Sequence, residues 1–560
     1  MPASSSTAAL DVDGPPLGGI GELVRTRAAS ASGRCSYLEH ARRDAGLRFV
    51  DLQVAVEAWA GWLRGSGVAG GARVGLLLGD PLEFAVAFVS LLAAGRWVAP
   101  LDPVAPPDAV AVGVGRLAPD LVVADRPRPA GLGGRWVELD RHSFVPGRGF
   151  APRSSSDDVA PRAAQGPGRP VPVGDGAGGG AGGVVLTSSG TTGDPKVVPL
   201  GEAQLVHTAA SVAVHHRLSP ADRGFNPLPL FHVNAEVVGL LAALVAGAGV
   251  VLDDRFHRTG FWSLMERRRI TWINAVPAII ARLAPLGPDE RVPAGIRFVR
   301  SASAPLAPGT LARFEAATGL RVVETYGMTE AASQITANPL DGVRKPGSVG
   351  LPVGIDLRVV PDHRAVPDEV RVRHPGAGMV EIRGASVRAE PGDPEPRSGR
   401  AGHRRAGSDP DGAPGPDGGW LSTGDVGYLD DDGYLFLVGR HGDVINRGGE
   451  KIAPREAEEL LLEDPAVRSA AVVGRPDAEL GQVPVAYVVL HGVTGPPDAP
   501  KAARDVERLA ESLRSRFARA RRPEAIHVLV SLPATPTGKV RRRALVDGAE
   551  PVVFSSEVSR

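Results

Sequence analysis

The sequence has almost no cysteine and no excess of charge of either sign. Cys35 is the only cysteine among 560 residues, which excludes an intramolecular disulfide and a cysteine-based metal site. A chain without disulfides suits a reducing compartment, so we expect a cytoplasmic protein. The 63 basic and 63 acidic residues balance, and the composition therefore indicates neither a nucleic-acid partner nor a membrane-surface role.

The chain also lacks a targeting signal and an apolar run of membrane-spanning length. Met1 to Gly14 contain no basic region followed by an apolar one, so no signal peptide is expected. The longest apolar run, 237–252, is shorter than the roughly 20 residues of a spanning helix and is interrupted by glycines. We interpret it as a buried helix, broken by glycine, that runs into a buried strand ending at Leu252. The short basic runs at 267–269 and 541–543 are typical of solvated helix faces or turns.

The length of the chain indicates more than one domain, since 560 residues exceed what one core organises. Helical and strand-like segments alternate in the first two thirds of the chain, which predicts an α/β fold with parallel sheets. After Gly439 the order of the predicted helices and strands is that of a small α+β unit. We therefore expect a large N-terminal domain, residues 1–440, and a small C-terminal domain, residues 441–560.

The spacing of apolar residues gives the expected elements. Helices are expected at 51–65, 81–94, 205–217, 260–268, 311–318, 454–463 and 501–516. Strands are expected at 72–78, 98–101, 120–124, 184–186, 270–274, 296–300, 322–324, 467–473, 483–490 and 525–529.

Three segments have weak signals for regular structure. The residues up to about Phe49 show little periodicity and are expected to be a poorly ordered N-terminal segment. Segments 154–183 and 390–419 are rich in Gly and Pro and poor in large apolar residues, so both are expected to be flexible. The glycine run at 175–183 precedes a predicted strand, whereas a dinucleotide-binding fingerprint follows one.

A loop of hydroxyl residues and glycines follows the predicted strand at 184–186. Glycines allow backbone N–H groups to point at one centre, and hydroxyls add donors, so the loop suits a polyphosphate. It is not a Walker A loop, because Pro195 precedes the lysine and Val197 follows it. The residues expected to bind phosphate are Thr187, Ser188, Ser189, Gly190, Thr191, Thr192, Gly193 and Lys196.

This loop and the blocks that follow it resemble, in the same order, the motifs of adenylate-forming enzymes: acyl-CoA synthetases, peptide-synthetase adenylation domains and luciferases. The later blocks are 229–232, 301–305, 324–330, 422–425, 438–443, 446–454 and 532–540. The resemblance covers most of the chain, from about Asp51 to Leu545. It implies parallel α/β sheets with a small β-barrel-like subdomain in the large domain, and a mobile C-terminal domain.

The resemblance implies a site for ATP and Mg²⁺. Tyr326 would stack on the adenine, Thr329 would bind an α-phosphate oxygen, and Glu330 would be a ligand of Mg²⁺, which takes few protein carboxylates. Asp425 would accept hydrogen bonds from both ribose hydroxyls, and Arg440 would contact the ribose. The other residues assigned to the nucleotide are Ser303, Ala304, Pro305, Glu324, Thr325 and Gly327.

The C-terminal blocks resemble segments that, in the family, move between two half-reactions. The first forms the acyl-adenylate, and the second forms the thioester. Lys539 matches the catalytic lysine of the family, which would bridge the attacking carboxylate and the α-phosphate. Asp443 would be the pivot between the domains. Gly448, Gly449 and Lys451 belong to the loop that would line the channel for CoA in the thioester-forming arrangement.

The acyl pocket is expected to draw on the residues after Glu330 and on His232, Val233, Asn234, Val237 and Ser301. A lone histidine is more often packed or capped than catalytic. The match of 229–232 to a block of the family nevertheless makes His232 a candidate catalytic residue, with Lys539, Thr329 and Glu330. Segments 261–262, 270–277 and 445–451 resemble oxalate–CoA ligases more than other acyl-CoA synthetases. The mixture of polar and apolar pocket residues does not identify the acid.

The chain departs from the family pattern at three places. Asp194 stands where a small hydroxyl residue is usual, and we expect its carboxylate to point away from the phosphates. Val197 stands where glycine is usual and is expected to enter a strand. Segment 390–419 replaces a Gly-Tyr motif and a short helix, and is expected to lie on the surface.

The leading interpretation is an ATP-dependent acyl-CoA synthetase with a small carboxylic acid, ATP and CoA as its partners. A stand-alone ligase that loads a carrier protein in trans is an alternative, since no carrier block follows Lys539. A non-catalytic AMP-binding relative is a further alternative. It is disfavoured because Lys539, Glu330, Asp425 and Arg440 are all present.

Overall fold

The computed structural model describes residues 18–139, 182–188, 196–362, 366–387, 419–519, 521–535, 538–548 and 551–558. Most of the segments 154–183 and 390–419 lies outside these ranges, so their expected flexibility stays a prediction. The chain forms two compact units. The first comprises Met1–Ala275, Asp289–Arg300 and Gly327–Ile335, and the second comprises Val276–Pro288, Ser301–Tyr326 and Thr336–Arg560. The boundary at 440/441 also stays a prediction.

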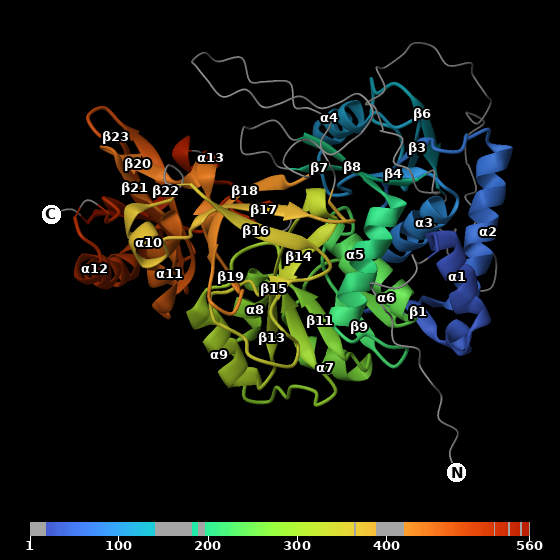
Figure 1. Cartoon of the computed structure of the whole chain (residues 1–560), viewed down its shortest axis with the longest axis horizontal. Helices are drawn as coiled ribbons and strands as arrows, with labels where there is room; N and C mark the ends of the chain where they lie inside the picture. The colour runs from blue at the N-terminus through green and yellow to red at the C-terminus, as the bar shows by residue number, and fades with distance from the viewer. Residues whose placement is uncertain are drawn as a thin grey trace. The chain divides into compact units, whose positions relative to one another are not determined.

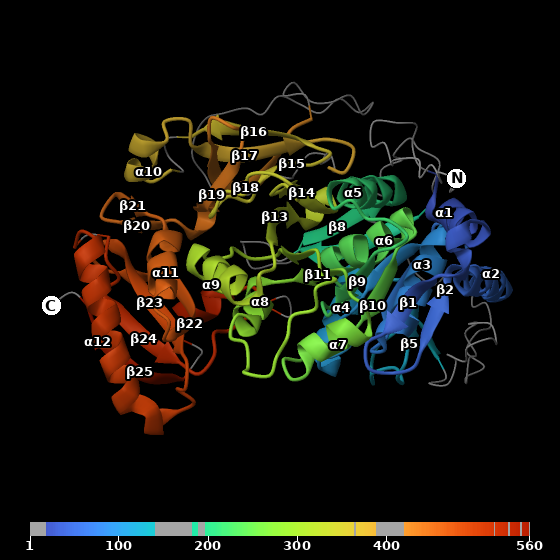
Figure 2. The same ribbon diagram turned by 90° about the horizontal axis from the view of Figure 1, so that it is seen from below.

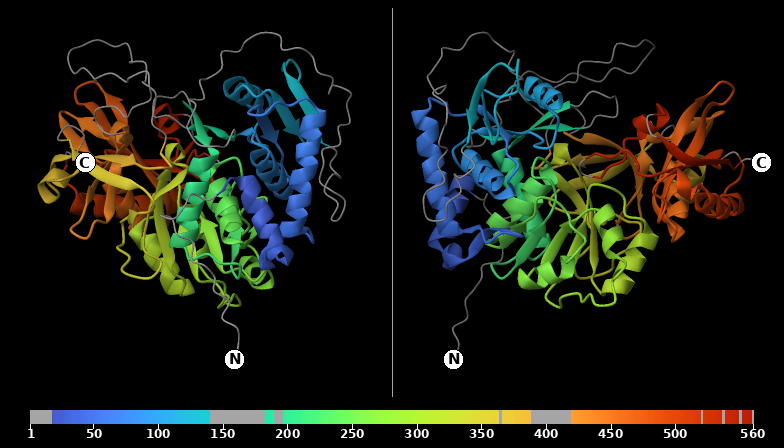
Figure 3. Two further views of the ribbon diagram at one scale, coloured as in Figure 1. Left: turned by 45° about the vertical axis from the view of Figure 1, so that its right-hand side comes forward. Right: turned by 180° about the vertical axis from the view of Figure 1, so that it is seen from behind.

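The N-terminal part of the first unit is regular, and the expectation of a poorly ordered segment up to Phe49 is wrong over the described residues. It contains α1 (Ile20–Ala29), β1 (Ser36–His40) and β2 (Gly46–Arg48). Only a short apolar face of α1 is buried, and this helix lies beside α2 (Phe49–Gly65) in the blue part of Figure 3. Contacts with distant parts of the chain therefore stabilise α1. Such contacts need only a few apolar residues on the helix, so its sequence shows little periodicity.

A six-stranded sheet of the first unit has the order β6-β5-β3-β4-β7-β8, and all of its strands except β5 are labelled in Figure 1. All neighbouring pairs are parallel except β7 with β8. Its strands are nearly continuous apolar runs, as expected for a sheet that is covered on both faces. The strands of this sheet and the helices between them are β3 (Arg73–Leu77), α3 (Pro81–Ala93), β4 (Trp97–Pro100), α4 (Pro107–Leu117), β5 (Leu121–Ala124), β6 (Arg135–Glu138), β7 (Gly183–Ser188) and β8 (Lys196–Gly201).

A second parallel sheet in this unit contains neighbouring strands in the order β11-β9-β10-β1, with β2 antiparallel at its edge. The prediction of parallel α/β sheets is thus confirmed. The elements that follow β8 in this unit are α5 (Glu202–His215), β9 (Arg223–Asn226), η2 (Asn234–Leu241), α6 (Ala242–Ala246), β10 (Gly249–Leu252), α7 (Phe261–Arg267) and β11 (Trp272–Ala275).

The long apolar run is a buried helix followed by a buried strand, as predicted. The helix continues through Gly239, where an added Cβ would lie 2.9 Å from the side chain of Asn226. It ends at Gly247, whose φ of 70° is in the left-handed region that glycine adopts at low cost. Among the residues that the structure describes, no helix combines the length and the apolar character required to cross a bilayer.

The chain crosses between the units around β12 (Phe298–Ser301), β13 (Val322–Met328), η3 (Thr329–Ala331) and β14 (Ser333–Ala337). The second unit also contains α8 (Pro277–Leu283), α9 (Pro308–Thr318), β15 (Leu351–Pro352), β16 (Asp356–Pro361), α10 (Asp368–Arg373), β17 (Gly378–Arg383), β18 (Leu421–Leu429), β19 (Leu435–Arg440) and η4 (His441–Asp443). Strands β16 to β19 form an antiparallel sheet in chain order. This sheet corresponds to the subdomain that was predicted to be β-barrel-like.

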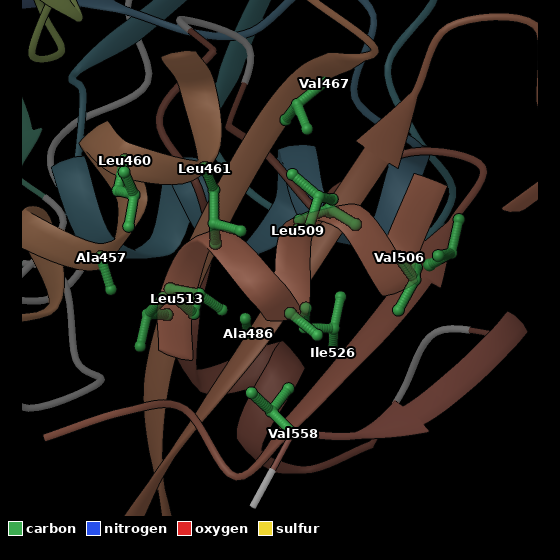
Figure 4. Close-up of a cluster of buried hydrophobic side chains, with 14 of the residues drawn as sticks. Ala457, Leu460, Leu461, Val467, Ala486, Val506, Leu509, Leu513, Ile526 and Val558 are labelled. Carbon is green, nitrogen blue, oxygen red and sulfur yellow. The ribbon is translucent and has the colours of Figure 1, made fainter. Parts of the chain in front are cut away.

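The C-terminal part of the second unit is an α+β layer, as predicted. Helices α11 (Pro454–Glu463) and α12 (Ala499–Arg516) lie against the sheet (Figure 2), and their apolar side chains meet those of the strands in one core (Figure 4). The other elements are β20 (Ile445–Arg447), β21 (Glu450–Ile452), β22 (Val467–Asp477), β23 (Gly481–Leu490), β24 (Ala525–Leu529), α13 (Arg542–Val546) and β25 (Val552–Glu557).

Candidate active site

The predicted phosphate loop is flanked by the antiparallel strands β7 and β8. Thr187 pairs with Val197, and Ser188 pairs with Lys196. Residues 189–195, which include most of the predicted phosphate ligands and Asp194, lie outside the described residues. Thr187 and Lys196 are exposed, whereas Val197 packs partly buried against the core beneath the sheet. The expectation that Val197 enters a strand is confirmed.

His232 lies in a turn just before η2. Its carbonyl accepts hydrogen bonds from the backbone N–H groups of Ala235 at 3.0 Å and Glu236 at 3.2 Å. Burial lowers the pKa of His232 to about 4, so the ring is neutral at neutral pH. Its Nε2 is buried and has no hydrogen-bond partner among the described residues. This nitrogen can therefore make one hydrogen bond to a bound molecule.

A buried arginine that the sequence analysis did not single out lies at the end of β12. The guanidinium of Arg300 donates to Asn234 Oδ1 at 2.8 Å, to Asn274 Oδ1 at 3.2 Å and to Gln334 Oε1 at 3.3 Å. These amides come from η2, β11 and β14, and only Asn234 was expected by name in the pocket. Burial lowers the pKa of Arg300 to about 9, which still leaves a cation at neutral pH.

The sequence contained one signal for this residue. Arg300 follows the apolar residues Phe298 and Val299 in one strand, and all three are buried. A charged residue is almost never fully buried without a function or a partner. The three amides lie far apart in the sequence, so the cluster itself could not be read from it.

Thr329 and Glu330 begin the short turn η3 in the first unit, two residues after Gly327. A Cβ on Gly327 would lie 1.5 Å from the carbonyl oxygen of Ser333, so only glycine fits there. Ala332 and Ser333 have φ values of 51° and 102°, which are strained for residues with side chains. Tight backbone packing therefore fixes this turn.

Glu330 is half-buried, and no hydrogen bond or ion pair of its carboxylate is found within the described ranges. The described residues contain no cluster of three side chains that could hold a metal by themselves. Mg²⁺ usually takes one or two carboxylates and completes its shell with water and phosphate oxygens. A single open carboxylate such as Glu330 fits this ion, although its role as a ligand remains a prediction.

The predicted adenine loop belongs to the second unit and is braced from β13. Thr325 Oγ1 donates to the carbonyl oxygen of Ser301 at 2.9 Å. The carboxylate of Glu324 accepts the backbone N–H of Leu306 at 3.4 Å. Ser303 has a φ of 73°, a strained conformation that such braces maintain. The side chains of Ser303, Ala304 and Pro305 are exposed or half-buried, which leaves the loop open to a ligand.

Asp425 in β18 is the centre of a polar cluster. Its carboxylate accepts hydrogen bonds from the phenol of Tyr326 and from Arg440 Nε, the latter at 3.1 Å. Its backbone N–H donates to Thr423 Oγ1 at 3.1 Å. Burial and the adjacent Asp425 carboxylate raise the pKa of Tyr326 far above its usual value, so the phenol remains a donor. Three contacts therefore hold Asp425 in one orientation.

Lys539 lies in a turn that is closed by a bridge between Ala534 and Val540. Its backbone N–H donates to Thr535 Oγ1 at 3.1 Å. Burial, together with the charge of Arg440, lowers the pKa of Lys539, and the carboxylates of Asp425 and Asp443 oppose this shift. The predicted catalytic lysine thus lies within electrostatic reach of both predicted ribose contacts.

The predicted hinge and CoA residues follow Arg440 closely in the sequence. Asp443 ends η4 and is 3.4 Å from Arg542 Nε. Gly448 and Gly449, with φ values of 58° and 94°, form the two-residue turn between β20 and β21, which requires positive φ at both positions. Lys451 pairs with Asn446 in this hairpin. Their roles in domain motion and CoA binding stay predictions.

The structure thus groups the predicted site residues within each unit. Tyr326, Asp425, Arg440 and Lys539 come together in the second unit. His232, Thr329 and Glu330 belong to the first unit, which also holds the Arg300 cluster. The roles of these residues in binding nucleotide, metal and acid remain predictions.

Two family models match the chain. The model of the AMP-binding enzyme family matches residues 27–389, and that of the AMP-binding enzyme C-terminal domain matches residues 456–539. Among solved structures, ATP-bound MatB from Rhodopseudomonas palustris superposes with a TM-score of 0.74 at 26% identity. The match covers 95% of this chain and 99% of that one.

Two curated relatives are similar over the same part of the chain. Sulfoacetate–CoA ligase of Cupriavidus necator is 40% identical over 376 residues, which are 65% of this chain and 67% of the relative. Oxalate–CoA ligase of Arabidopsis thaliana is 36% identical over 370 residues, which are 65% of this chain and 66% of the relative. The matched region therefore spans about two thirds of each relative.

Proposed function

Because the chain belongs to the AMP-binding enzyme family, we propose that it is an ATP-dependent acyl-CoA synthetase. The resemblance to adenylate-forming enzymes is confirmed by this membership. The observation that carries the proposal is the position of Lys539, whose ammonium lies within electrostatic reach of Asp425 and Arg440. The two relatives described above are CoA ligases for sulfoacetate and oxalate, which supports a thioester product.

The proposed reaction has two steps. The carboxylate of the acid attacks the α-phosphorus of ATP, and pyrophosphate leaves, which gives an acyl-adenylate. The thiolate of CoA then attacks the acyl carbon, the bond to AMP breaks, and the thioester forms. The first step needs positioning and charge neutralisation rather than a nucleophile of the enzyme.

The residues of this chain would share that work. Asp425, oriented by Tyr326 and Arg440, would hold the ribose of ATP. Lys539 would place its positive charge between the attacking carboxylate and the α-phosphate. Mg²⁺, held in part by Glu330, would supply neutralisation of the remaining phosphate charge. Neither relative described above is a carrier-protein ligase, so free CoA is the proposed acceptor.

Purified protein incubated with ATP, Mg²⁺, CoA and a panel of small carboxylic acids tests the proposal. We expect pyrophosphate release that depends on the acid, and a thioester that is identified by its mass. Lys539→Ala should lower the rate of adenylation by roughly 100- to 1,000-fold, as expected when a transition-state charge contact is lost.

Lys501→Ala is the matched control, because Lys501 is an exposed lysine of the same unit whose ammonium contacts only the carbonyl of His491 in the described residues. This variant should keep the rate of the unmodified protein. Full adenylation activity in Lys539→Ala would refute the assigned mechanism. No thioester with any acid would refute the synthetase itself.

A further inference from the structure

Several arginines of the first unit pair with carboxylates, whereas Arg300 pairs with none in the ranges that the structure describes. Arg297 pairs with Asp222 at 2.9 Å, Arg42 pairs with Asp253 at 3.0 Å, and Arg223 pairs with Glu39. Arg300 is more deeply buried than these, at 1% exposure, yet the described residues give it only neutral amide oxygens as partners. Its positive charge therefore has no counter-ion within the described part of the chain.

The polar atoms left without partners in this cluster are all donors. Arg300 Nε, Asn234 Nδ2 and Gln334 Nε2 are buried, and no acceptor for them is found in the described part of the chain. An unpaired buried donor destabilises the folded protein, and an unpaired buried charge does so more strongly. Among the described residues, the cluster thus lacks an acceptor that carries negative charge.

Neighbouring titratable groups do not supply this charge. Glu236 in η2 is fully buried, and burial raises its pKa far above the usual value, so its carboxyl is neutral. Neither of its oxygens has a partner among the described residues. His215 and His216, which feel the charge of Arg300, have pKa values lowered by burial and are neutral as well.

We propose that Arg300, with Asn234 and Gln334, binds a second anionic group on the substrate acid, distinct from the carboxylate that is activated. This inference rests on the proposed function. A planar guanidinium with flanking amide donors suits an oxyanion, either a carboxylate or a sulfonate, and binds it through charge-assisted hydrogen bonds. Asn234 follows the block 229–232, which lines the acyl pocket in the family resemblance.

The acid therefore carries a second anionic group besides the carboxylate that is activated. Lining the site with donors also excludes acids that end in a methyl group, because such an acid would leave the buried donors unpaired. When a site is built to hydrogen-bond a substrate group, kcat/KM for an analogue that lacks this group can be lower by about 10⁴-fold.

Matched acids test this selectivity. Malonate and sulfoacetate carry a second carboxylate and a sulfonate respectively, and propionate is the uncharged analogue of similar length. We expect kcat/KM for at least one of the two dianions to exceed that for propionate by about 100-fold or more. The better of the two dianions identifies the anionic group. Equal or greater kcat/KM for propionate would overturn the inference and leave the synthetase proposal intact.

Substitution of Arg300 supplies the second test. Arg300→Met should lower kcat/KM for the preferred dianion by about 100-fold and change that for propionate far less. Arg300→Lys should recover part of the loss because it keeps the charge. Arg297→Gln is the matched control and should keep the ratio of the two kcat/KM values, since Arg297 pairs with Asp222 just before the same strand.

A binding measurement separates this inference from the reaction. The preferred dianion should raise the thermal unfolding midpoint of the unmodified protein without ATP, and propionate should not. Arg300→Met should lose this shift. If Arg300→Met does not fold, Gln334→Leu replaces it and should weaken binding of the dianion about tenfold. The inference would be overturned if Arg300→Met and Gln334→Leu both kept the preference of the unmodified protein for the dianion over propionate in kcat/KM, and also kept its midpoint shift.

Discussion

Glu324 illustrates, at the scale of a single residue, how burial without an ion pair changes a carboxyl group. Its side chain is buried and accepts one long hydrogen bond, from the backbone N–H of Leu306. Burial raises the pKa of Glu324 from 4.5 to about 7, and the positive charge of Arg455 only partly opposes this. The folded protein therefore binds a proton at Glu324 more tightly than the unfolded chain does.

This shift predicts a specific pH dependence of stability. Between pH 4.5 and about 7 the folded state holds more protons at Glu324, so its contribution to stability falls as the pH rises through that window. In Glu324→Gln this fall should be absent, a difference of about 2–3 kcal/mol across the window. Urea denaturation at pH 5, 6, 7 and 8 measures it.

Glu511→Gln is the control for this prediction, because Glu511 is exposed on α12 and forms only a surface ion pair with Arg514. Its stability should follow pH as that of the unmodified protein does. Parallel pH profiles for Glu324→Gln and the unmodified protein would contradict the raised pKa.

Single residues also show what a sequence can reveal about a site. Tyr326, Asp425 and Lys539 were predicted because each lies in a local motif, and the structure brings them together. Arg300 was missed because its environment depends on Asn274 and Gln334, which other strands supply. A motif records local chemistry, whereas burial of a charge is a property of the folded chain.

At the scale of elements, α12 shows how an amphipathic helix closes a core. Its apolar residues at three- and four-residue spacing include Val506, Leu509 and Leu513, all buried against the sheet of β22 to β24. Leu509→Ala should lower the free energy of unfolding by about 2–5 kcal/mol, since it leaves a cavity in a packed core. Chemical denaturation measures this loss.

Glu507→Ala on the exposed face of the same helix should change stability by less than about 0.5 kcal/mol. This pair separates loss of core packing from loss of helix propensity, because alanine favours a helix in both positions. An equal loss in both variants would mean that α12 does not contribute through its apolar face.

Local signals explain which elements the sequence could define. Helix α11 and strand β24 have the predicted bounds, because Pro454 begins the helix and apolar residues fill the strand. Helix α1 was not predicted, since much of what holds it is distant. Arg27 on α1, for example, donates from Nε to the carbonyl of Leu244 at 3.2 Å.

At the scale of the whole molecule, the proposed mechanism uses Lys539 in the first half-reaction. The lysine would neutralise charge there, and it has no assigned task once the acyl-adenylate exists. Lys539→Ala supplied with a synthetic acyl-adenylate and CoA should therefore form thioester within about threefold of the rate of the unmodified protein, because no transition-state contact of that step is lost.

Single-turnover kinetics with mass detection of the thioester measures this second step. Lys501→Ala again provides the control for loss of an exposed lysine. If Lys539→Ala failed in this step as strongly as in adenylation, the lysine would serve both half-reactions and the assignment would have to change.

The discontinuous first unit has a consequence for protein synthesis. Its segments Asp289–Arg300 and Gly327–Ile335 are separated from the rest by stretches that belong to the second unit. Arg300 and Gln334 lie in these late segments, so a nascent chain that ends before Gln334 cannot complete the cluster around Arg300. Expression fragments that stop near residue 280 lack β12 and β14, and they should emerge from the ribosome without a finished anion site.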